Sequence, residues 1–359
     1  MIYLVITSIT ILFLLNVLLI YSVKKLNSIS KSVNHSVNIS IVVAAKNEAS
    51  NIDGLIHSLQ NLDYPIEMFE VIIIDDHSTD MTYDKLKTKI DSIINFSVLD
   101  LKSFNGSGKR DALTLGINKS EHPFIMITDA DCRPEKNWLT AYSKKFNEGF
   151  EILFGFAPFH QHKSLISKIS CFENLRSSIL SFSMAAFELP YTAAARNFGF
   201  TKKAFETLGG YSKTKDTLSG DDDLLLREAV KHKMKIGTVT EADSFVFSET
   251  KKSFKEYFQQ KARHTQTSFH YLLKQKLIIG SWHILNLAFL FSPILMLINP
   301  LFALLLPLKL VSDFVTVKLN QKKFGYTFSA GEIFYLQIIY ELFLVVHFFN
   351  ARFLKVRWK

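Results

Sequence analysis

Two aspartates separated by one residue follow an apolar run in the segment FIMITDADCRP, residues 124–134. The run is typical of a buried strand. Residues i and i+2 of an extended chain point to the same side, so Asp129 and Asp131 can aim at one point. Two close carboxylates repel each other unless a cation or a shared proton lies between them. A hard divalent ion such as Mg²⁺ or Mn²⁺ is the natural partner, because it leaves coordination positions for water and phosphate oxygens. Structural capping is the alternative for the pair taken by itself.

Two other apolar runs also end in polar residues. NISIVVAA leads into Lys46-Asn47-Glu48, and FEVIII leads into Asp75 and Asp76. The acids of the second segment suit a turn or a helix N-cap. A carboxylate at a strand edge also accepts a base N–H or a ribose hydroxyl, so one of these two acids is a candidate binding residue.

Two charged segments stand before helical patterns. NGSGKRDAL (105–113) has two glycines before Lys109 and lacks the Walker spacing. It is either a flexible basic loop or a phosphate-contacting loop that leads into a helix N-terminus. LSGDDDLLLREAVKH (218–232) places three aspartates before a leucine-rich helix. Negative charge stabilises a helix N-terminus, but three acids exceed what a cap needs, so one of them is a candidate general base.

The elements that position these residues alternate between strands and helices. Strands are expected at 38–45, 69–76, 96–101 and 124–131, and helices at 51–60, 80–90 and from 109. This alternation predicts an α/β fold with a parallel sheet covered by helices on both faces. Ligands of such sheets lie beyond the carboxyl ends of the strands, where the acids collect.

Apolar segments at both ends of the chain predict membrane helices. Residues 1–23 contain no charged side chain and are long enough to span a bilayer as a retained anchor. Lys24, Lys25 and Lys31 follow at once, which places the next segment in the cytoplasm by the positive-inside rule.

The C-terminal apolar segment is longer than one span. Residues 277–311 are expected to form two spans joined at Asn299-Pro300, and 333–349 to span or to lie in the interface. The division expected is an anchor (1–23), a cytoplasmic domain (24–276) and a C-terminal membrane region (277–359) with two or three transmembrane helices. A basic tail after three such spans would lie outside, against the positive-inside rule.

Charge and cysteine content narrow the class of protein. The net charge is +9, but the lysines and arginines are spread out and many flank apolar segments, which argues against a nucleic-acid partner. The two cysteines form no CxxC pair, so zinc and redox motifs are absent and unpaired thiols are expected.

Six segments in order resemble one family. VVAAKNEASNI, VIIIDDHSTD, GKRDAL, ITDADCRP, SGDDDLL and QKARH match the motif order of the membrane-anchored members of glycosyltransferase family 2, such as cellulose, chitin and hyaluronan synthases. The resemblance covers residues 38–268. It implies a GT-A fold, a mostly parallel mixed sheet flanked by helices, with transmembrane helices at both ends. It also implies inverting transfer from a nucleotide-diphospho-sugar, most often a UDP-sugar.

The resemblance further implies roles for single residues. Asp129 and Asp131 match the DxD pair that holds Mg²⁺ or Mn²⁺ with the diphosphate. Asp222 matches the catalytic base and Asp221 its neighbour, with the register of the run open by one residue. Asn197 and His264 fall on the acceptor side. The donor-binding positions are Ala45, Asn47, Glu48, Asp76, Lys109, Asp129, Gln260 and Arg263.

The segment around Arg263 departs from the family pattern, because His264 stands where QxxRW has a tryptophan. That change favours addition of one or few sugars over polymerisation. We therefore expect a multi-pass enzyme of the cell membrane, with its catalytic domain in the cytoplasm, that transfers a sugar to a lipid-linked or envelope glycan acceptor. The alternatives are a processive polysaccharide synthase and a non-catalytic membrane scaffold with a degenerate transferase domain.

Overall fold

The computed structural model describes residues 2–26, 36–214, 217 and 220–353. The chain divides into two compact units, each described by itself. The sheet unit comprises residues 29–158 and 192–249, and the helical unit comprises 1–28, 159–191 and 250–359. The predicted boundary at 276 differs from this division, because 159–191 and 250–276 group with the apolar helices. Lys31 and the basic tail from residue 354 lie outside the described residues.

The described part of the sheet unit is built on a seven-stranded sheet with the order β3-β2-β1-β4-β7-β6-β8. The four strands β1 to β4 are parallel, β7 is antiparallel to β4 and β6, and β6 is parallel to β8. The predicted mostly parallel mixed sheet is confirmed. Its strands are β1 (Ile39–Ala45), β2 (Phe69–Asp75), β3 (Phe96–Asp100), β4 (Phe124–Asp129), β6 (Ile152–Gly155), β7 (Phe198–Thr201) and β8 (Ile236–Val239). A separate antiparallel pair is formed by β5 (Cys132–Pro134) and β9 (Val246–Ser248).

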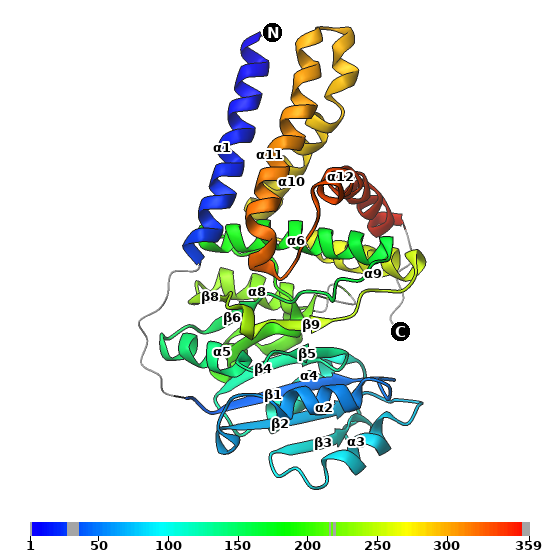
Figure 1. Ribbon diagram of the computed structural model, residues 1–359. Coiled ribbons are helices and arrows are strands. Elements are labelled where there is room, and N and C mark those ends of the chain that lie inside the picture. The colour runs from blue at the N-terminus through cyan, green and yellow to red at the C-terminus, as the bar shows by residue number, and fades with distance from the viewer. Residues whose placement is uncertain (1, 27–35, 215–216, 218–219, 354–359) are drawn as a thin grey trace. The chain divides into compact units, whose positions relative to one another are not determined.

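Helices flank this sheet (Figure 1). The three helices predicted in the first half are confirmed, with ends that shift by no more than two residues. The helices of the sheet unit are α2 (Ile52–Gln60), α3 (Thr82–Ile90), α4 (Lys109–Lys119), α5 (Trp138–Asn147), α7 (Lys202–Leu208) and α8 (Asp221–Lys231).

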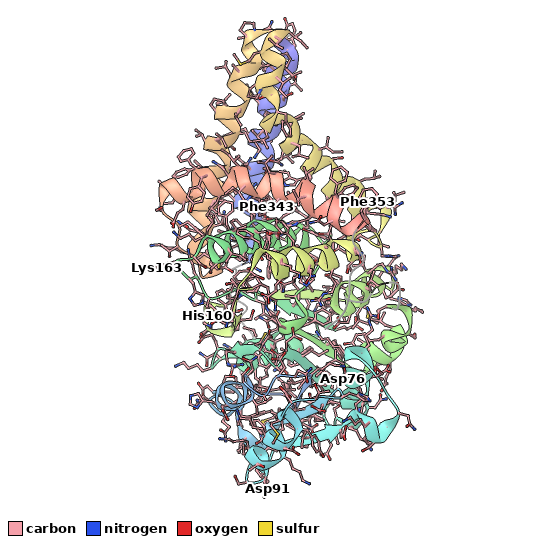
Figure 2. All side chains as sticks on the ribbon, turned by 90° about the vertical axis from the view of Figure 1, so that its right-hand side faces the viewer. Asp76, Asp91, His160, Lys163, Phe343 and Phe353 are labelled. Atoms are coloured by element: carbon pink, nitrogen blue, oxygen red, sulfur yellow. The ribbon has the colours of Figure 1, made fainter. Side chains whose placement is uncertain are left out.

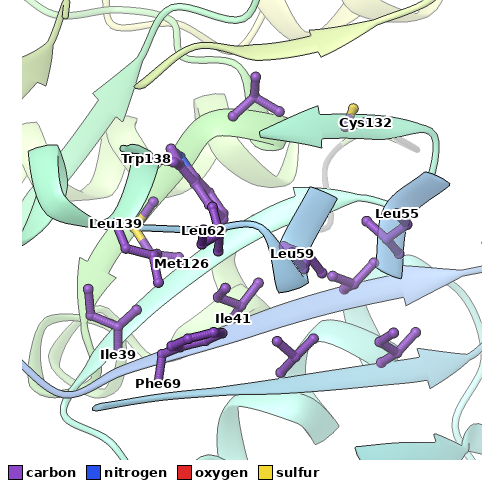
Figure 3. Packing of buried hydrophobic residues seen from close by; sticks show 14 of the residues in the cluster. Ile39, Ile41, Leu55, Leu59, Leu62, Phe69, Met126, Cys132, Trp138 and Leu139 are labelled. Carbon is purple, nitrogen blue, oxygen red and sulfur yellow. The ribbon is translucent and has the colours of Figure 1, made fainter. Parts of the chain in front are cut away.

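The core of the sheet unit forms where α2 and α5 cover strands β1, β2 and β4 (Figure 3). β1 is buried along nearly its whole length, as expected for a central parallel strand rich in β-branched residues. Leu55 and Leu59 of α2 pack on one side of this core, and Trp138 and Leu139 of α5 pack beside them. The spacing of the apolar residues of α2 at i, i+3, i+4 and i+7 thus reports its buried face.

α4 lies close to the strands. A methyl group at Gly116 would approach Ile74 Cδ1 and Val42 Cγ1 to 2.5 Å, so only glycine allows this packing distance. The close fit fixes α4 against β1 and β2, and with it the position of Lys109 at the first residue of the helix.

The helical unit contains longer and more apolar helices. Its helices are α1 (Ile2–Leu26), α6 (Leu165–Ala186), α9 (Phe254–Ser268), α10 (Leu273–Leu290), α11 (Leu305–Asn320) and α12 (Ala330–Phe353). α1 packs against α6 and α11, and α10 packs against α11 after a turn that includes Asn299 and Pro300, as predicted (Figure 1). α12 packs against α6 and α9, and it runs across the direction of α1 and α11 (Figure 2).

Three segments of the described chain are long and apolar enough to cross a membrane: Val5–Leu26, Pro300–Phe324 and Ala330–Phe353. α10 is not among them. Large apolar side chains on α1, including Tyr3, Phe13 and Leu14, are exposed in the protein alone. Apolar surface of this extent marks a site of interaction with a membrane or a partner.

Candidate functional site

The carboxyl ends of β1, β2 and β4 lie side by side at one edge of the sheet. Ala45 at the end of β1 pairs with Asp75 of β2, and Ala44 pairs with Asp129 of β4. The register therefore brings the acids of two separate sequence segments to the same edge. This was the expected place for a ligand of a parallel sheet.

Asp76 is almost fully buried at this edge. Its backbone N–H donates to Ala45 O at 2.7 Å, and its Oδ1 accepts from the N–H of Gly108 at 3.0 Å. Lys46 Nζ lies 3.6 Å from Oδ2, and His77 Nδ1 lies 3.1 Å from Oδ1. Asp76 thus ties the β2 end to the loop before α4. Gly108 has φ of 87°, a conformation that favours glycine. The partners Lys46 and His77 were not predicted as site residues.

Asn47 and Glu48 tie two loops together. Thr79 N–H donates to Asn47 Oδ1 at 2.8 Å, and the Glu48 N–H donates to the hydroxyl of Thr82 at 2.8 Å. The Glu48 carboxylate accepts from Asn51 Nδ2 at 2.6 Å. These bonds order the loops after β1 and β2. A donor contact by either side chain stays a prediction.

Lys109 bridges two carboxylates from distant parts of the sequence. Its Nζ lies 2.8 Å from Asp129 Oδ1 and 3.5 Å from Asp221 Oδ2. Burial would lower the pKa of Lys109, but the charges of Asp129 and Asp221 outweigh burial and raise it. The side chain therefore stays a cation at any physiological pH.

Asp129 and Asp131 are half-buried and close together. One oxygen of each and Cys132 Sγ lie within 4.8 Å of one another, so these groups can meet at one ion. The carboxylates supply the oxygen ligands that Mg²⁺ and Mn²⁺ prefer. Cys132 is fully buried, and burial followed by the charge of Asp131 raises the pKa of its thiol well above the usual value. The thiol stays protonated, and the donor set fits a hard divalent ion held by the two aspartates.

The three aspartates at the start of α8 face different partners, since successive helical residues point about 100° apart. Asp221 pairs with Lys109. Asp222 Oδ2 accepts from Ala195 N–H at 2.6 Å. Asp223 Oδ1 accepts from the hydroxyl of Thr192 at 2.7 Å and from Ala193 N–H at 2.9 Å. The run thus fastens the 192–195 loop beside Lys109, a link that the sequence analysis missed.

Asp222 differs from its neighbours in exposure. Asp221 and Asp223 are buried, whereas Asp222 is half-buried. Burial and then the charges of Asp223 and Asp221 raise the pKa of Asp222 well above the usual 3.8. A partly exposed carboxylate with a raised pKa suits a general base. This geometry favours Asp222 over Asp221 in the register that the sequence left open.

Asn197 is fully buried, and its place on the acceptor side stays a prediction. Its Oδ1 accepts from Trp138 Nε1 at 2.8 Å and from the hydroxyl of Tyr142 at 2.7 Å, while its Nδ2 donates to Phe156 O at 2.7 Å. These bonds occupy the amide inside the core. Asn197 braces the segment that follows the 192–195 loop, because buried polar groups must find partners.

Gln260, Arg263 and His264 lie on α9 of the helical unit. Gln260 and Arg263 are one turn apart on this helix. α9 is held within its unit by Tyr257, whose hydroxyl donates to Glu173 of α6, and by Lys261, whose Nζ lies 3.1 Å from Glu173 Oε1. A contact between these residues and the aspartates of the sheet unit stays a prediction.

Comparisons with known proteins agree with this geometry. Residues 40–208 match the family described as Glycosyl transferase family 2. The chain is 25% identical over 197 residues, 53% of its length, to the probable glycosyltransferase YdaM of Bacillus subtilis, and 37% identical over 101 residues, 28% of its length, to a beta-monoglucosyldiacylglycerol synthase of Nostoc. It spans only 46% and 22% of these two relatives.

A solved structure shares the fold. The mannosyltransferase PcManGT of Pyrobaculum calidifontis, in complex with GDP-Man and Mn²⁺, superposes with a TM-score of 0.60 at 15% identity, over 97% of this chain and 98% of that one. At that identity the likeness concerns the fold alone. Residues 40–208 of this chain are therefore similar to glycosyltransferase family 2 domains, and the sheet unit that contains most of these residues has the GT-A fold.

Proposed function

We propose that this protein is a membrane-bound, inverting glycosyltransferase that moves a sugar from a nucleotide-diphospho-sugar, most simply a UDP-sugar, to a lipid-linked acceptor. One observation carries the proposal. In the sheet unit, most of which matches glycosyltransferase family 2, Asp129 of the Asp129–Asp131 pair and Asp221 of α8 both contact Lys109 at the carboxyl edge of the sheet. This transfer needs carboxylates that bind a divalent ion, a cation that contacts the diphosphate, and a partly exposed carboxylate that accepts a proton.

The chain's own residues divide the chemistry among them. An acceptor hydroxyl attacks the anomeric carbon from the face opposite the nucleotide. The new carbon–oxygen bond forms as the bond to the diphosphate breaks, and the proton passes to the Asp222 carboxylate. Lys109 faces the negative charge that develops on the leaving diphosphate. A contact of Arg263 with the same diphosphate stays a prediction. Mg²⁺ or Mn²⁺ held by Asp129 and Asp131 would supply further positive charge there.

The helical unit is proposed to hold the enzyme in a membrane. α1 and the Pro300–Phe324 segment are apolar, and α1 exposes several of its large side chains. Lys24 and Lys25 occupy the last turn of α1. By the positive-inside rule, these lysines favour a cytoplasmic location for the sheet unit that follows.

α12 is proposed to lie along the membrane surface rather than to cross it. Figure 2 shows α12, which carries Phe343 and Phe353, running across the direction of α1. A helix in that direction cannot cross the bilayer together with α1 and α11. Two of its faces pack on α6 and α9, and apolar residues such as Phe348 and Phe353 are exposed.

The acceptor is proposed to be a lipid or a lipid-linked glycan. An enzyme whose own chain includes helices apolar enough to enter a membrane works close to such molecules, and one relative carries the name of a synthase of a glucosyl diacylglycerol. His264 in place of the tryptophan of QxxRW favours transfer of one or few sugars.

A donor screen tests the proposal. Full-length protein in detergent would receive labelled UDP- and GDP-sugars with Mg²⁺ or Mn²⁺ and a membrane lipid extract, and the extracted lipids would be analysed by mass spectrometry. We expect a mass increase of one or a few sugars with one donor. A ladder of many sugars would favour a processive synthase. The absence of both transfer and hydrolysis with every donor would favour the scaffold.

A further inference from the structure

Lys109 has an unusual position for a residue expected to contact a donor. Its ammonium already contacts Asp129, which is half of the DxD pair, and Asp221, which precedes the proposed base. Asp129 is at the end of β4 and Asp221 begins α8. Lys109 therefore links Asp129 of the proposed ion site to Asp221, the residue before the proposed base.

The position of Lys109 is fixed from several sides. It is the first residue of α4, whose packing against β1 and β2 depends on Gly116. The preceding Gly108 donates its N–H to Asp76 at 3.0 Å. Because the backbone is held at both points, a change of partner by Lys109 requires only rotation of its side chain, of which 19% is exposed.

We propose that Lys109 is an exchangeable cation: it occupies Asp129 when no donor is bound, and it turns to the diphosphate when donor and divalent ion bind together. This inference rests on the proposed function and adds that the divalent ion binds together with the donor rather than before it. A divalent ion alone at Asp129 and Asp131 would place positive charge beside the ammonium, and like charges repel. A diphosphate supplies negative charge that offsets both cations.

The proposal has a direct consequence for binding. A divalent ion alone has to displace Lys109 from Asp129, so it binds weakly. In the presence of a nucleoside diphosphate, Lys109 has another anionic partner and the penalty disappears. The two ligands therefore strengthen each other's binding, and this coupling is reciprocal by thermodynamic linkage. Lys109 is then a positioning residue for the ion as well as a ligand of the phosphate.

The test measures Mn²⁺ binding rather than transfer. Free Mn²⁺ would be followed by electron paramagnetic resonance during titration of the full-length protein, with and without UDP. The variants are Lys109→Met and Lys109→Gln, which remove the charge, and Lys109→Arg, which keeps it. Lys119→Met at the other end of α4 is the matched control, because it makes the same change on the same helix.

We expect Lys109→Met and Lys109→Gln to bind Mn²⁺ alone about tenfold more tightly than the wild type, which corresponds to a shift of about one pKa unit for removal of a contacting charge. We also expect UDP to strengthen Mn²⁺ binding in the wild type and in Lys109→Arg, and to do so much less in Lys109→Met. Lys119→Met should match the wild type. Thermal melting of each variant would show which of them fold. One folded variant, either Lys109→Met or Lys109→Gln, is enough for the test.

Unchanged or weaker binding of Mn²⁺ alone in the folded uncharged variants would overturn the exchange. If the wild type transfers sugar and binds UDP while those variants gain no affinity for Mn²⁺, only the role of Lys109 fails. If the wild type binds neither UDP nor GDP, the proposed function fails with it.

Discussion

The sheet unit and the helical unit each bury a group of charged side chains, and the two groups differ in balance. In the helical unit Lys309 Nζ lies 2.7 Å from Asp313 Oδ2 and 3.1 Å from Glu341 Oε1, and Arg176 Nη2 lies 3.3 Å from the same oxygen of Asp313. Two cations face two carboxylates, and the group joins α6, α11 and α12. In the sheet unit, by contrast, Lys109 contacts Asp129 and Asp221, with further aspartates at 131, 222 and 223.

The difference indicates a division of roles. A buried group whose charges balance is complete without a ligand, and removal of one member leaves an uncompensated charge. The acid-rich group of the sheet unit is half-exposed at Asp129, Asp131 and Asp222, where ligands can enter. We interpret the balanced group as a structural clamp of three helices and the acid-rich group as a site for an ion, a phosphate and a proton.

The largest effect is expected at the proposed base. Asp222→Asn removes the proton acceptor but keeps the shape of the side chain, so transfer should fall by about 10²–10⁴-fold, the usual contribution of a general base. Binding of UDP should change little, because the aspartates at 129 and 131 are intact. Steady-state kinetics and equilibrium binding of UDP to the same preparation would separate the two quantities.

Asp91→Asn, an exposed substitution at the end of α3, is the control for the loss of one negative charge. If Asp222→Asn lost donor binding while single-turnover transfer of bound donor stayed normal, the role of Asp222 as a base would be wrong.

The balanced group is expected to affect stability instead. Asp313→Ala leaves Lys309 and Arg176 to share one buried carboxylate, that of Glu341, so one buried positive charge is uncompensated. We expect the free energy of unfolding to fall by about 3–5 kcal/mol. The double variant Lys309→Met with Asp313→Leu removes one charge of each sign, and it should lose less than Asp313→Ala alone. Thermal unfolding in detergent would rank the variants.

The same experiment sharpens the comparison between the two groups. The fraction of Asp313→Ala that remains folded should bind UDP as the wild type does. A stable Asp313→Ala protein with impaired UDP binding would reverse the roles that we assign.

The pH dependence of transfer gives a smaller effect. The base acts as a carboxylate, so kcat/KM should fall as the pH drops through the pKa of Asp222. Burial and the charges of Asp223 and Asp221 raise this pKa, so the acid limb should lie above the usual 3.8. Asp221→Asn removes one of the repelling charges and should move the limb to lower pH. A limb that moves to higher pH in Asp221→Asn would contradict this electrostatic account.

Much of the fold could be predicted from local patterns. The β-branched run of β1 and the apolar spacing of α2 identified a central strand and its covering helix. The position of Asp129 at the end of a strand identified the edge of the sheet at which the candidate site lies, because the carboxyl ends of parallel strands meet at one edge. These features depend on short segments, whose periodicity reports which side is buried.

The remaining features depend on contacts between distant segments. Lys109 and Asp221 are separated by more than a hundred residues, and no local pattern indicates their ion pair. Asn197 matched an acceptor-side motif, but the bonds from Trp138 and Tyr142 of α5 bury it. Residues 165–186, which form α6, fall inside the domain expected over 24–276, but they group with the apolar helices. Polar residues of α6, such as Glu173 and Arg176, are paired inside the helical unit.

The most direct test of the central claim is Mn²⁺ binding in the presence of UDP by the Asp129→Asn/Asp131→Asn variant. The account predicts that UDP-dependent Mn²⁺ binding, measured by electron paramagnetic resonance, is lost in this variant and retained in Asp91→Asn. Equal UDP-dependent binding in the double variant and the wild type, with transfer that continues unchanged in a chelator, would contradict it.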